Sequence, residues 1–204
     1  MPQKNDFQEI EKPNVIYPAG LVHTFFHHEK SKPLIVEIGP GRGDLLFHLA
    51  NEHPEAIVVG IELKSKRVDK MIARIEKLEL TNVILLQADA KTALDELKDQ
   101  PIKEWHIHFS DPWPKRRHAP RRLLSLPFLE NCSALLQPKG KISITTDVEW
   151  YAHDVAKIID RIPQLSSCSP EKVQTSSDDA FPTYFAEKWK KAGRNIYYLR
   201  YWKS

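Results

Sequence analysis

Residues 34–43 read Leu-Ile-Val-Glu-Ile-Gly-Pro-Gly-Arg-Gly, a short apolar run that ends at three alternating glycines. An apolar run of this length, closed by turn residues, predicts a buried strand. Glycine lets the backbone turn tightly and approach a ligand closely. Residues 44–51 follow with leucines on one helical face, so the stretch predicts a strand, a glycine-rich turn and a helix, the opening unit of a parallel α/β sheet.

The same alternation of strand and helix continues along the chain. We expect further strands at residues 56–61, 83–86, 105–109, 142–145 and 196–202, and helices at 64–79, 92–98, 125–136 and 149–162. The segment 163–182 is rich in Ser, Pro and Asp and is expected to be a loop with room for one short strand. The alternation predicts an α/β, Rossmann-like fold, with a mostly parallel seven-stranded sheet and helices on both faces.

Length and composition narrow the class of protein. The 204 residues fit a single domain, with residues 1–18 as a loose polar arm and a short helix at 21–28. There is no apolar signal segment, no apolar run near the ~18 residues of a membrane span, and no CxxC pair between Cys132 and Cys168. We therefore expect a cytoplasmic protein with no membrane partner. His23 and His27 lack a third ligand, so no metal site is expected.

Three predicted strand ends carry groups that suit a nucleotide-like cofactor. The glycines follow the first strand, where the start of a helix offers unpaired N–H groups. Glu62 closes the second strand, where a carboxylate can accept hydrogen bonds from both hydroxyls of a ribose. Asp89 follows the third strand. Ligands of open α/β sheets bind outside the carboxyl ends of the strands, so we expect these groups to share one site.

The spacing of the glycines discriminates between two cofactors. Dinucleotide-binding folds usually have GxGxxG, whereas residues 39–43 read GxGxG and Glu37 precedes them. This pattern resembles the first motif of the class I S-adenosylmethionine-dependent methyltransferases. The resemblance implies S-adenosyl-L-methionine as the cofactor, with Glu37 near the ammonium group of its methionine moiety and residues 87–90 at its adenine. The implied cofactor-binding residues are Glu37, Gly39, Gly41, Gly43, Glu62, Asp89, Ala90 and Asp111.

The fourth predicted strand runs into Phe-Ser-Asp-Pro-Trp-Pro-Lys-Arg-Arg-His, residues 109–118, which Arg121 and Arg122 follow. Five of the thirty Lys and Arg residues lie between 115 and 122, although the net charge of the chain is only +3. An acid beside an aromatic ring suits a purine, and we expect this acid, Asp111, to be buried. The basic run suits the phosphates of a nucleic acid.

This second motif closely resembles F-[SP]-D-P-W-x-K-x-R-H-x-x-R-R of the bacterial tRNA (guanine-N7-)-methyltransferases, and the resemblance spans roughly residues 20–202. It implies transfer of the methyl group of S-adenosyl-L-methionine to N7 of guanosine at position 46, in the variable loop of tRNA, with Asp111 as the catalytic acid. A tRNA would be the partner of a monomer or a homodimer. The residues expected to bind tRNA are Trp113, Lys115, Arg116, Arg117, His118, Arg121, Arg122, Asp147, Thr183, Tyr184, Phe185 and Glu187.

One position departs from the pattern of that family. The family motif T-x-[YF]-E-x-[KR] begins at Thr183, but its glutamate falls on Ala186 and Glu187 comes one position later. The contact that the family's carboxylate makes with the acceptor is therefore not expected at residue 186. Glu187 would replace it only if the backbone shifted.

Methylation of guanine N7 depends on positioning more than on proton transfer, because N7 carries a lone pair and no proton. The atom must be held in line with the methyl group, and the positive charge that develops on the purine favours a nearby carboxylate. We therefore expect Asp111 to stabilise charge rather than to act as a base. Two alternatives stay open: methylation of an exocyclic amine of adenine or cytosine, and a non-catalytic RNA-binding protein on the same fold.

Overall fold

The computed structural model describes residues 16–17, 32–98, 100–178 and 180–204. The strands are β1 (Ile16–Tyr17), β2 (Leu34–Ile38), β3 (Ile57–Ile61), β4 (Val83–Leu86), β5 (Ile102–His108), β6 (Leu136–Thr146), β7 (Leu165–Ser167) and β8 (Tyr197–Lys203). The helices are α2 (Asp44–Glu52), α3 (Ser65–Lys77), α4 (Ala90–Glu96), the 3-10 helix η1 (Arg116–Arg121), α5 (Leu126–Leu135), α6 (Glu149–Ile159) and α7 (Tyr184–Lys191). The helix expected at 21–28 and most of the expected arm, residues 1–18, lie outside the described residues.

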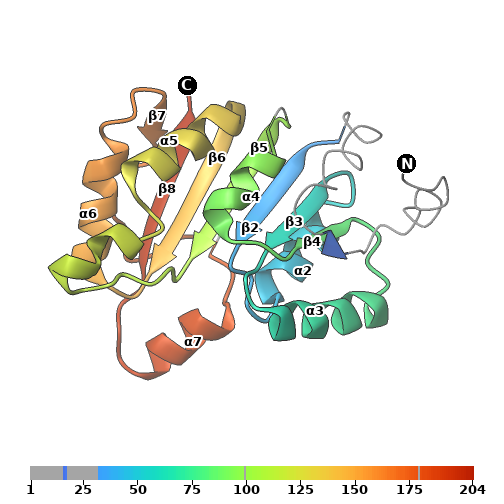
Figure 1. Ribbon diagram of the computed structural model, residues 1–204. Helices are drawn as coiled ribbons and strands as arrows, with labels where there is room; N and C mark the ends of the chain where they lie inside the picture. The colour runs from blue at the N-terminus through green and yellow to red at the C-terminus, as the bar shows by residue number, and fades with distance from the viewer. Residues whose placement is uncertain (1–15, 18–31, 99, 179) are drawn as a thin grey trace.

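The strands form one sheet in the order β1-β4-β3-β2-β5-β6-β8-β7 (Figure 1). The pairs from β1 to β6 are parallel, whereas β8 runs antiparallel to both β6 and β7. From β2 the chain builds outward to β3 and β4 on one side and then to β5 and β6 on the other. Ligands of α/β sheets bind at such a reversal of strand order. The predicted fold class is confirmed, and the two-residue β1 adds an eighth strand at one edge.

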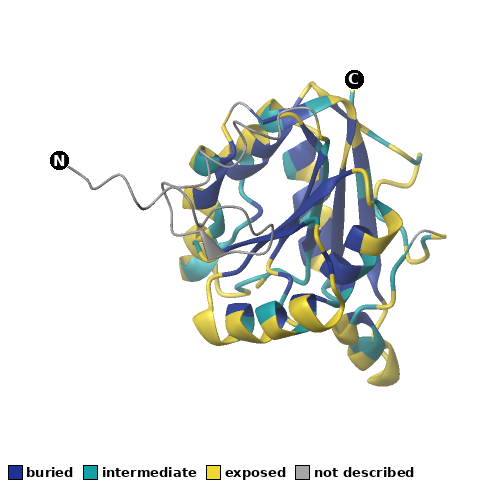
Figure 2. Cartoon of the chain, turned by 90° about the vertical axis from the view of Figure 1, so that its right-hand side faces the viewer, coloured by how far each residue is buried: buried dark blue, intermediate teal, exposed yellow. Residues whose placement is uncertain are grey.

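Helices cover both faces of the sheet and explain why its central strand is buried throughout. All five residues of β2 are buried, as expected for a parallel strand with both faces covered. One apolar cluster joins the sheet to α4, α5 and α6, and a second joins it to α2 and α3. Figure 2 shows the sheet as a buried layer between helices whose outer sides are exposed.

Strand β6 is longer than the sequence predicts. The pattern Gln-Pro-Lys-Gly at 137–140 predicts a turn after the helix, but β6 begins at Leu136 and includes these residues. Lys139 has a φ of 62°, and the pairing between β5 and β6 changes register between Ile102 and Glu104. The turn residues therefore form an irregularity inside the strand instead of preceding it.

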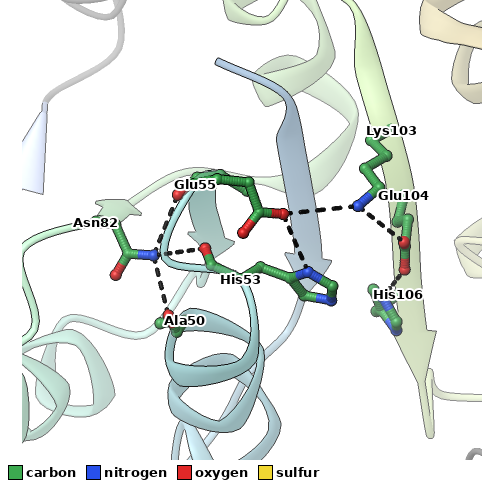
Figure 3. A network of polar contacts seen from close by, with 8 residues as sticks. Ala50, His53, Glu55, Asn82, Lys103, Glu104 and His106 are labelled. Atoms are coloured by element: carbon green, nitrogen blue, oxygen red, sulfur yellow. Dashed lines mark hydrogen bonds and ion pairs between the residues drawn. The ribbon is translucent and has the colours of Figure 1, made fainter.

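A polar network joins the sheet to the turn that precedes β3 (Figure 3). Asn82 Nδ2 donates hydrogen bonds of 3.0, 3.0 and 3.1 Å to the carbonyl oxygens of Ala50, His53 and Ala56. On β5, His106 Nε2 lies 3.2 Å from a carboxylate oxygen of Glu104. The network thus holds the end of α2 and fixes the ring of His106.

Candidate active site

The glycine-rich turn joins β2 to α2 at the carboxyl edge of the sheet. Gly39, Gly41 and Gly43 have φ values of 71°, 60° and 78°, a region that residues with a Cβ rarely adopt. The Gly39 N–H donates to the carbonyl of Ile61 at 2.8 Å, which fixes the turn to the end of β3. A Cβ on Gly43 would lie 2.6 Å from the ring of Phe47, whereas a Cβ on Gly39 would meet nothing within 4 Å. The turn thus leaves open space in front of Gly39.

Glu37 occupies β2 beneath this turn and is an unusual buried acid. Its side chain is only 4% exposed, and its Oε2 has no hydrogen-bond partner. Burial, and to a lesser degree the nearby carboxylate of Asp44, raise the pKa of Glu37 to about 8. An unsatisfied buried polar atom is costly, so this carboxylate is suited to a cationic ligand group.

The other acids expected to bind the cofactor lie at the neighbouring strand ends. Glu62 follows β3 and is buried; its Oε1 accepts from the Lys64 N–H at 2.9 Å, and its Oε2 lies 3.3 Å from Arg67 Nη1. These contacts fix the orientation of the Glu62 carboxylate. Asp89 is the N-cap of α4 and accepts from the Lys91 N–H at 2.9 Å, and Ala90 begins that helix.

The loop after β5 contains two non-glycine residues in the left-handed region. Phe109 has a φ of 52° and Trp113 a φ of 43°, and such backbone persists only where its surroundings hold it in place. Asp111 lies between them. It is exposed and makes no hydrogen bond or ion pair with a described residue. The expectation that this acid is buried is therefore wrong, and its carboxylate is open to a substrate.

Arg122 is half-buried and holds the backbone of this loop. Its Nε donates to the carbonyl of Pro112 at 2.9 Å, and its Nη2 donates to the carbonyl of Trp113 at 3.3 Å. On the other side, its guanidinium lies 4.9 Å from the ring centre of Trp150 and 3.8 Å from a carboxylate oxygen of Asp154, both on α6. Arg122 is thus half-buried, with 21% of its side chain exposed, and it holds the backbone of the loop; its contact with a phosphate stays a prediction.

The other cations of the basic run remain at the surface around Trp113. The exposed ones are Lys115, Arg116, Arg117 and Arg121. The Arg121 guanidinium lies 5.1 Å from the ring centre of Trp113, and the ring of His118 meets Trp113 edge-on at 5.6 Å. An aromatic ring with cations beside it is the combination that single-stranded nucleic acid binds, through stacking and phosphate contacts.

The start of helix α7 lies against the glycine-rich turn. The sequence did not predict this helix. Thr183 is its N-cap and accepts from the Ala186 N–H at 3.2 Å. Thr183, Tyr184 and Phe185 line a pocket together with the glycine-rich turn, and the Arg42 guanidinium lies 4.7 Å from the ring centre of Tyr184. The threonine cap and the lysines of the last turn were the signals that could have revealed this helix.

The remaining predicted contacts have other surroundings. Ala186, within α7, is buried at 3% exposed, while Glu187, one residue later, does not line the pocket with the glycine-rich turn. Asp147 follows β6 and lies 2.5 Å from Arg194 Nη1, and the Arg194 guanidinium lies 4.0 Å from the ring centre of Trp189. Asp147 therefore attaches the end of α7 to the sheet.

Two classes of feature are missing from the part of the chain that the structure describes. It contains no helix long and apolar enough to cross a membrane. Within the same ranges, no group of three or more His, Cys, Asp or Glu side chains is arranged to hold a metal ion.

Known proteins resemble the chain in sequence. A family model described as "Putative methyltransferase" matches residues 31–199. A tRNA (guanine-N(7)-)-methyltransferase of Thermotoga maritima is 34% identical over 81% of this chain and 52% of that protein. A second, of Rubrobacter xylanophilus, is 32% identical over 81% of this chain and 74% of that protein. The chain thus spans about half the length of the first relative and about three quarters of the second.

Solved structures share the fold. The 16S rRNA methyltransferase KamB superimposes with a TM-score of 0.64 at 16% identity, covering 89% of this chain and 93% of that one. A 16S rRNA (adenine(1408)-N(1))-methyltransferase with cosubstrate SAM, from Catenulisporales acidiphilia, gives a TM-score of 0.62 at 15% identity, covering 88% and 90%. These likenesses confirm the expected Rossmann-like methyltransferase fold.

Proposed function

The chain belongs to the tRNA (guanine-N(7)-)-methyltransferase family, and on that premise we propose that it transfers the methyl group of S-adenosyl-L-methionine to N7 of a guanosine in the variable loop of tRNA. The product is 7-methylguanosine, the partner is tRNA and the place of action is the cytoplasm. One observation supports this most strongly: the glycine-rich turn and the Ser-Asp-Pro-Trp-Pro loop follow β2 and β5, which are paired neighbours. A cofactor and an acceptor base would therefore meet at this edge.

The residues around the glycine-rich turn fit S-adenosyl-L-methionine. The unsatisfied oxygen of Glu37 suits its ammonium group, the carboxylate of Glu62 suits its ribose hydroxyls, and Asp89 with Ala90 lies where the adenine would follow. The open space in front of Gly39 lets the chain of such a ligand approach the backbone. When bound, this cofactor supplies an electrophilic methyl group on a sulfonium ion.

Asp111 and Trp113 act on the acceptor base. The exposed Asp111 carboxylate accepts hydrogen bonds from guanine N–H groups and stabilises the positive charge that methylation leaves on the purine. Because N7 has no proton, no base is needed. Trp113 offers a stacking face, an interaction of about 1–3 kcal/mol per base.

Cations of the loop have two separate roles in this proposal. Lys115, Arg116, Arg117 and Arg121 bind phosphates from the surface. Arg122 instead fixes the backbone on either side of Trp113, through the carbonyls of Pro112 and Trp113. It is a positioning residue for Asp111 and not a contact to RNA.

A direct assay tests the proposed reaction. The protein is incubated with unmodified tRNA and methyl-labelled cofactor, and the product is cleaved with borohydride and aniline, which breaks the chain at 7-methylguanosine. We expect label in tRNA and one scission in the variable loop, and neither with Asp111→Ala. Label on an exocyclic amine would establish the alternative reaction instead. Binding of cofactor and tRNA without any transfer would establish a non-catalytic binding protein.

A further inference from the structure

Two rows of polar side chains cross one face of the sheet between β2 and β8. The strand registers place Glu37 beside His106, His106 beside Ser143, and Ser143 beside Arg200. Two residues further along β5, His108 lies beside Thr145, and Thr145 lies beside Tyr198. Since alternate residues of a strand point to the same face, both rows share the face of Glu37.

The second row lines a pocket that adjoins the proposed cofactor pocket. The pocket lies between this face of the sheet and residues of α2 and α7, and its polar lining includes His108, Thr145 and Arg200. Leu45, His108 and Thr183 line both pockets, so the two meet at His108. No aspartate or glutamate among the described residues lines the second pocket. The lining of the second pocket therefore offers hydrogen-bond donors and the Arg200 guanidinium, without an acid of its own.

Two polar atoms of this row are buried without a partner. They are Nε2 of His108 and Oγ1 of Thr145, and Thr145 is 4% exposed. His106 differs, because its Nε2 is already held by Glu104 (Figure 3). Burial, with the charges of His106 and Arg200, lowers the pKa of His108 well below its ordinary value. The His108 ring is therefore neutral, with one N–H to donate.

The chemistry of an amino acid links these atoms to Glu37. An α-amino acid carries its ammonium and carboxylate groups on one carbon, so the nitrogen lies about 2.5 Å from the carboxyl carbon by ordinary bond lengths. A site that binds the ammonium at Glu37 must therefore meet the carboxylate close by. His108 and Thr145 offer unsatisfied donors there, and the hydroxyl of Thr183 accepts from the Ala186 N–H, which leaves its own proton to donate.

We propose that His108 and Thr145 form the subsite for the carboxylate of the cofactor's methionine moiety. The inference rests on the proposed function, since it requires S-adenosyl-L-methionine as the ligand. His108 donates its N–H and Thr145 its O–H, while Glu37 receives the ammonium. The pocket's remaining cation, Arg200, adds a favourable field for the same carboxylate.

Calorimetry with two ligands tests the subsite. The full chain is titrated with S-adenosyl-L-methionine and with decarboxylated S-adenosylmethionine, which keeps the ammonium and lacks the carboxylate. A hydrogen bond to a charged group predicts that the wild type prefers the complete cofactor by about ten- to hundredfold. His108→Ala and Thr145→Val should each remove most of this preference by weakening only the complete cofactor. Glu37→Gln should weaken both ligands, and Ser143→Ala should change neither.

The outcomes separate the subsite from the proposed function. Equal binding of both ligands to the wild type would overturn the subsite and leave the cofactor assignment intact. The same conclusion would follow if His108→Ala and Thr145→Val weakened both ligands equally. A wild type that binds neither ligand would overturn the proposed function together with the subsite. Circular dichroism checks folding, and the nearly isosteric Thr145→Val carries the test if His108→Ala unfolds the protein.

Discussion

The turn after β2 and the loop after β5 lie side by side at the same edge of the sheet, but they keep their shapes by different means. In the turn, the residues in the left-handed region are Gly39, Gly41 and Gly43. In the loop, they are Phe109 and Trp113, which carry large side chains. The turn is shaped by its own residues, whereas the loop depends on Arg122 and on α6.

Because of this difference, we expect substitutions in the turn after β2 and in the loop after β5 to impair the site by different mechanisms. Damage to the turn has to act through a Cβ that does not fit or through loss of the buried acid. Damage to the loop can come from a residue that touches no ligand. Each of the following experiments changes one half of the site and measures the property that this half is expected to control.

Gly43→Ala should have the largest effect. The new Cβ would lie 2.6 Å from the ring of Phe47, which is 3% exposed and has little room to move, at a φ of 78°. Left-handed strain and overpacking together predict a loss of about 2–4 kcal/mol in the free energy of unfolding. Gly39→Ala, with nothing within 4 Å of its Cβ, should lose only about 1 kcal/mol. Urea denaturation measures both, and equal losses would contradict this account of the turn.

The affinity for S-adenosyl-L-methionine should rise with pH because of Glu37. Its carboxyl must be ionised to take the ammonium, and burial raises its pKa to about 8, so binding at lower pH requires loss of a proton. The dissociation constant should fall about ninefold between pH 6 and pH 7 and only about two- to fivefold more by pH 8, because about half of the carboxyl is ionised by then. Above about pH 8 the gain stops, as the cofactor's own amino group loses its proton.

Calorimetry at pH 6, 7 and 8 measures this dependence, with Glu37→Gln as a control whose weaker binding should not vary. A flat profile for the wild type would contradict the role of Glu37. The raised pKa also has a consequence for the protein without cofactor. Its stability should fall as pH rises from the ordinary value of 4.5 towards 8, because the folded state holds this proton more tightly than the unfolded chain.

Arg122→Ala should have the smallest effect of the three and a distinct kinetic signature. Without the bonds to the carbonyls of Pro112 and Trp113, the loop samples other shapes, and kcat at saturating tRNA should fall about tenfold. Arg117→Ala, at the exposed surface, should instead raise KM for tRNA and reduce the slope of log affinity against log salt by about one. An Arg122→Ala variant that changes only KM and the salt slope would show that Arg122 binds RNA after all.

The same difference explains what could be predicted from the sequence. Closely spaced glycines indicate a tight turn directly from the sequence, so the turn after β2 could be predicted. The same holds for the acids Glu37 and Glu62 near the ends of β2 and β3. Nothing in the spacing of the basic run distinguishes Arg122 from Arg121. Only the packing of α6 against the loop places Trp150 and Asp154 beside one of them.

Sheet register set a second limit to prediction. The sequence alone leaves His106 and His108 as two alternating histidines of one strand, most simply packed or hydrogen-bonded. His106 is held by Glu104 of its own strand, whereas the surroundings of His108 depend on which residues of β6 and β8 lie near it. Helix α7 was missed because its eight residues are too few for the spacing of apolar residues to distinguish a helix from a loop.

The position of β8 has a consequence for the order in which the protein assembles. This strand follows β7 in the chain, yet in the sheet it lies between β6 and β7. On a ribosome, β2 to β5 can pair as soon as they emerge, so the glycine-rich turn can form early. In contrast, β7 cannot pair until β8 has been synthesised. The ion pair of Asp147 likewise cannot form until Arg194 has been added to the chain. The nascent chain would therefore form its glycine-rich turn first, whereas the pockets that α7 and β8 help to line would be complete only after β8 has been synthesised.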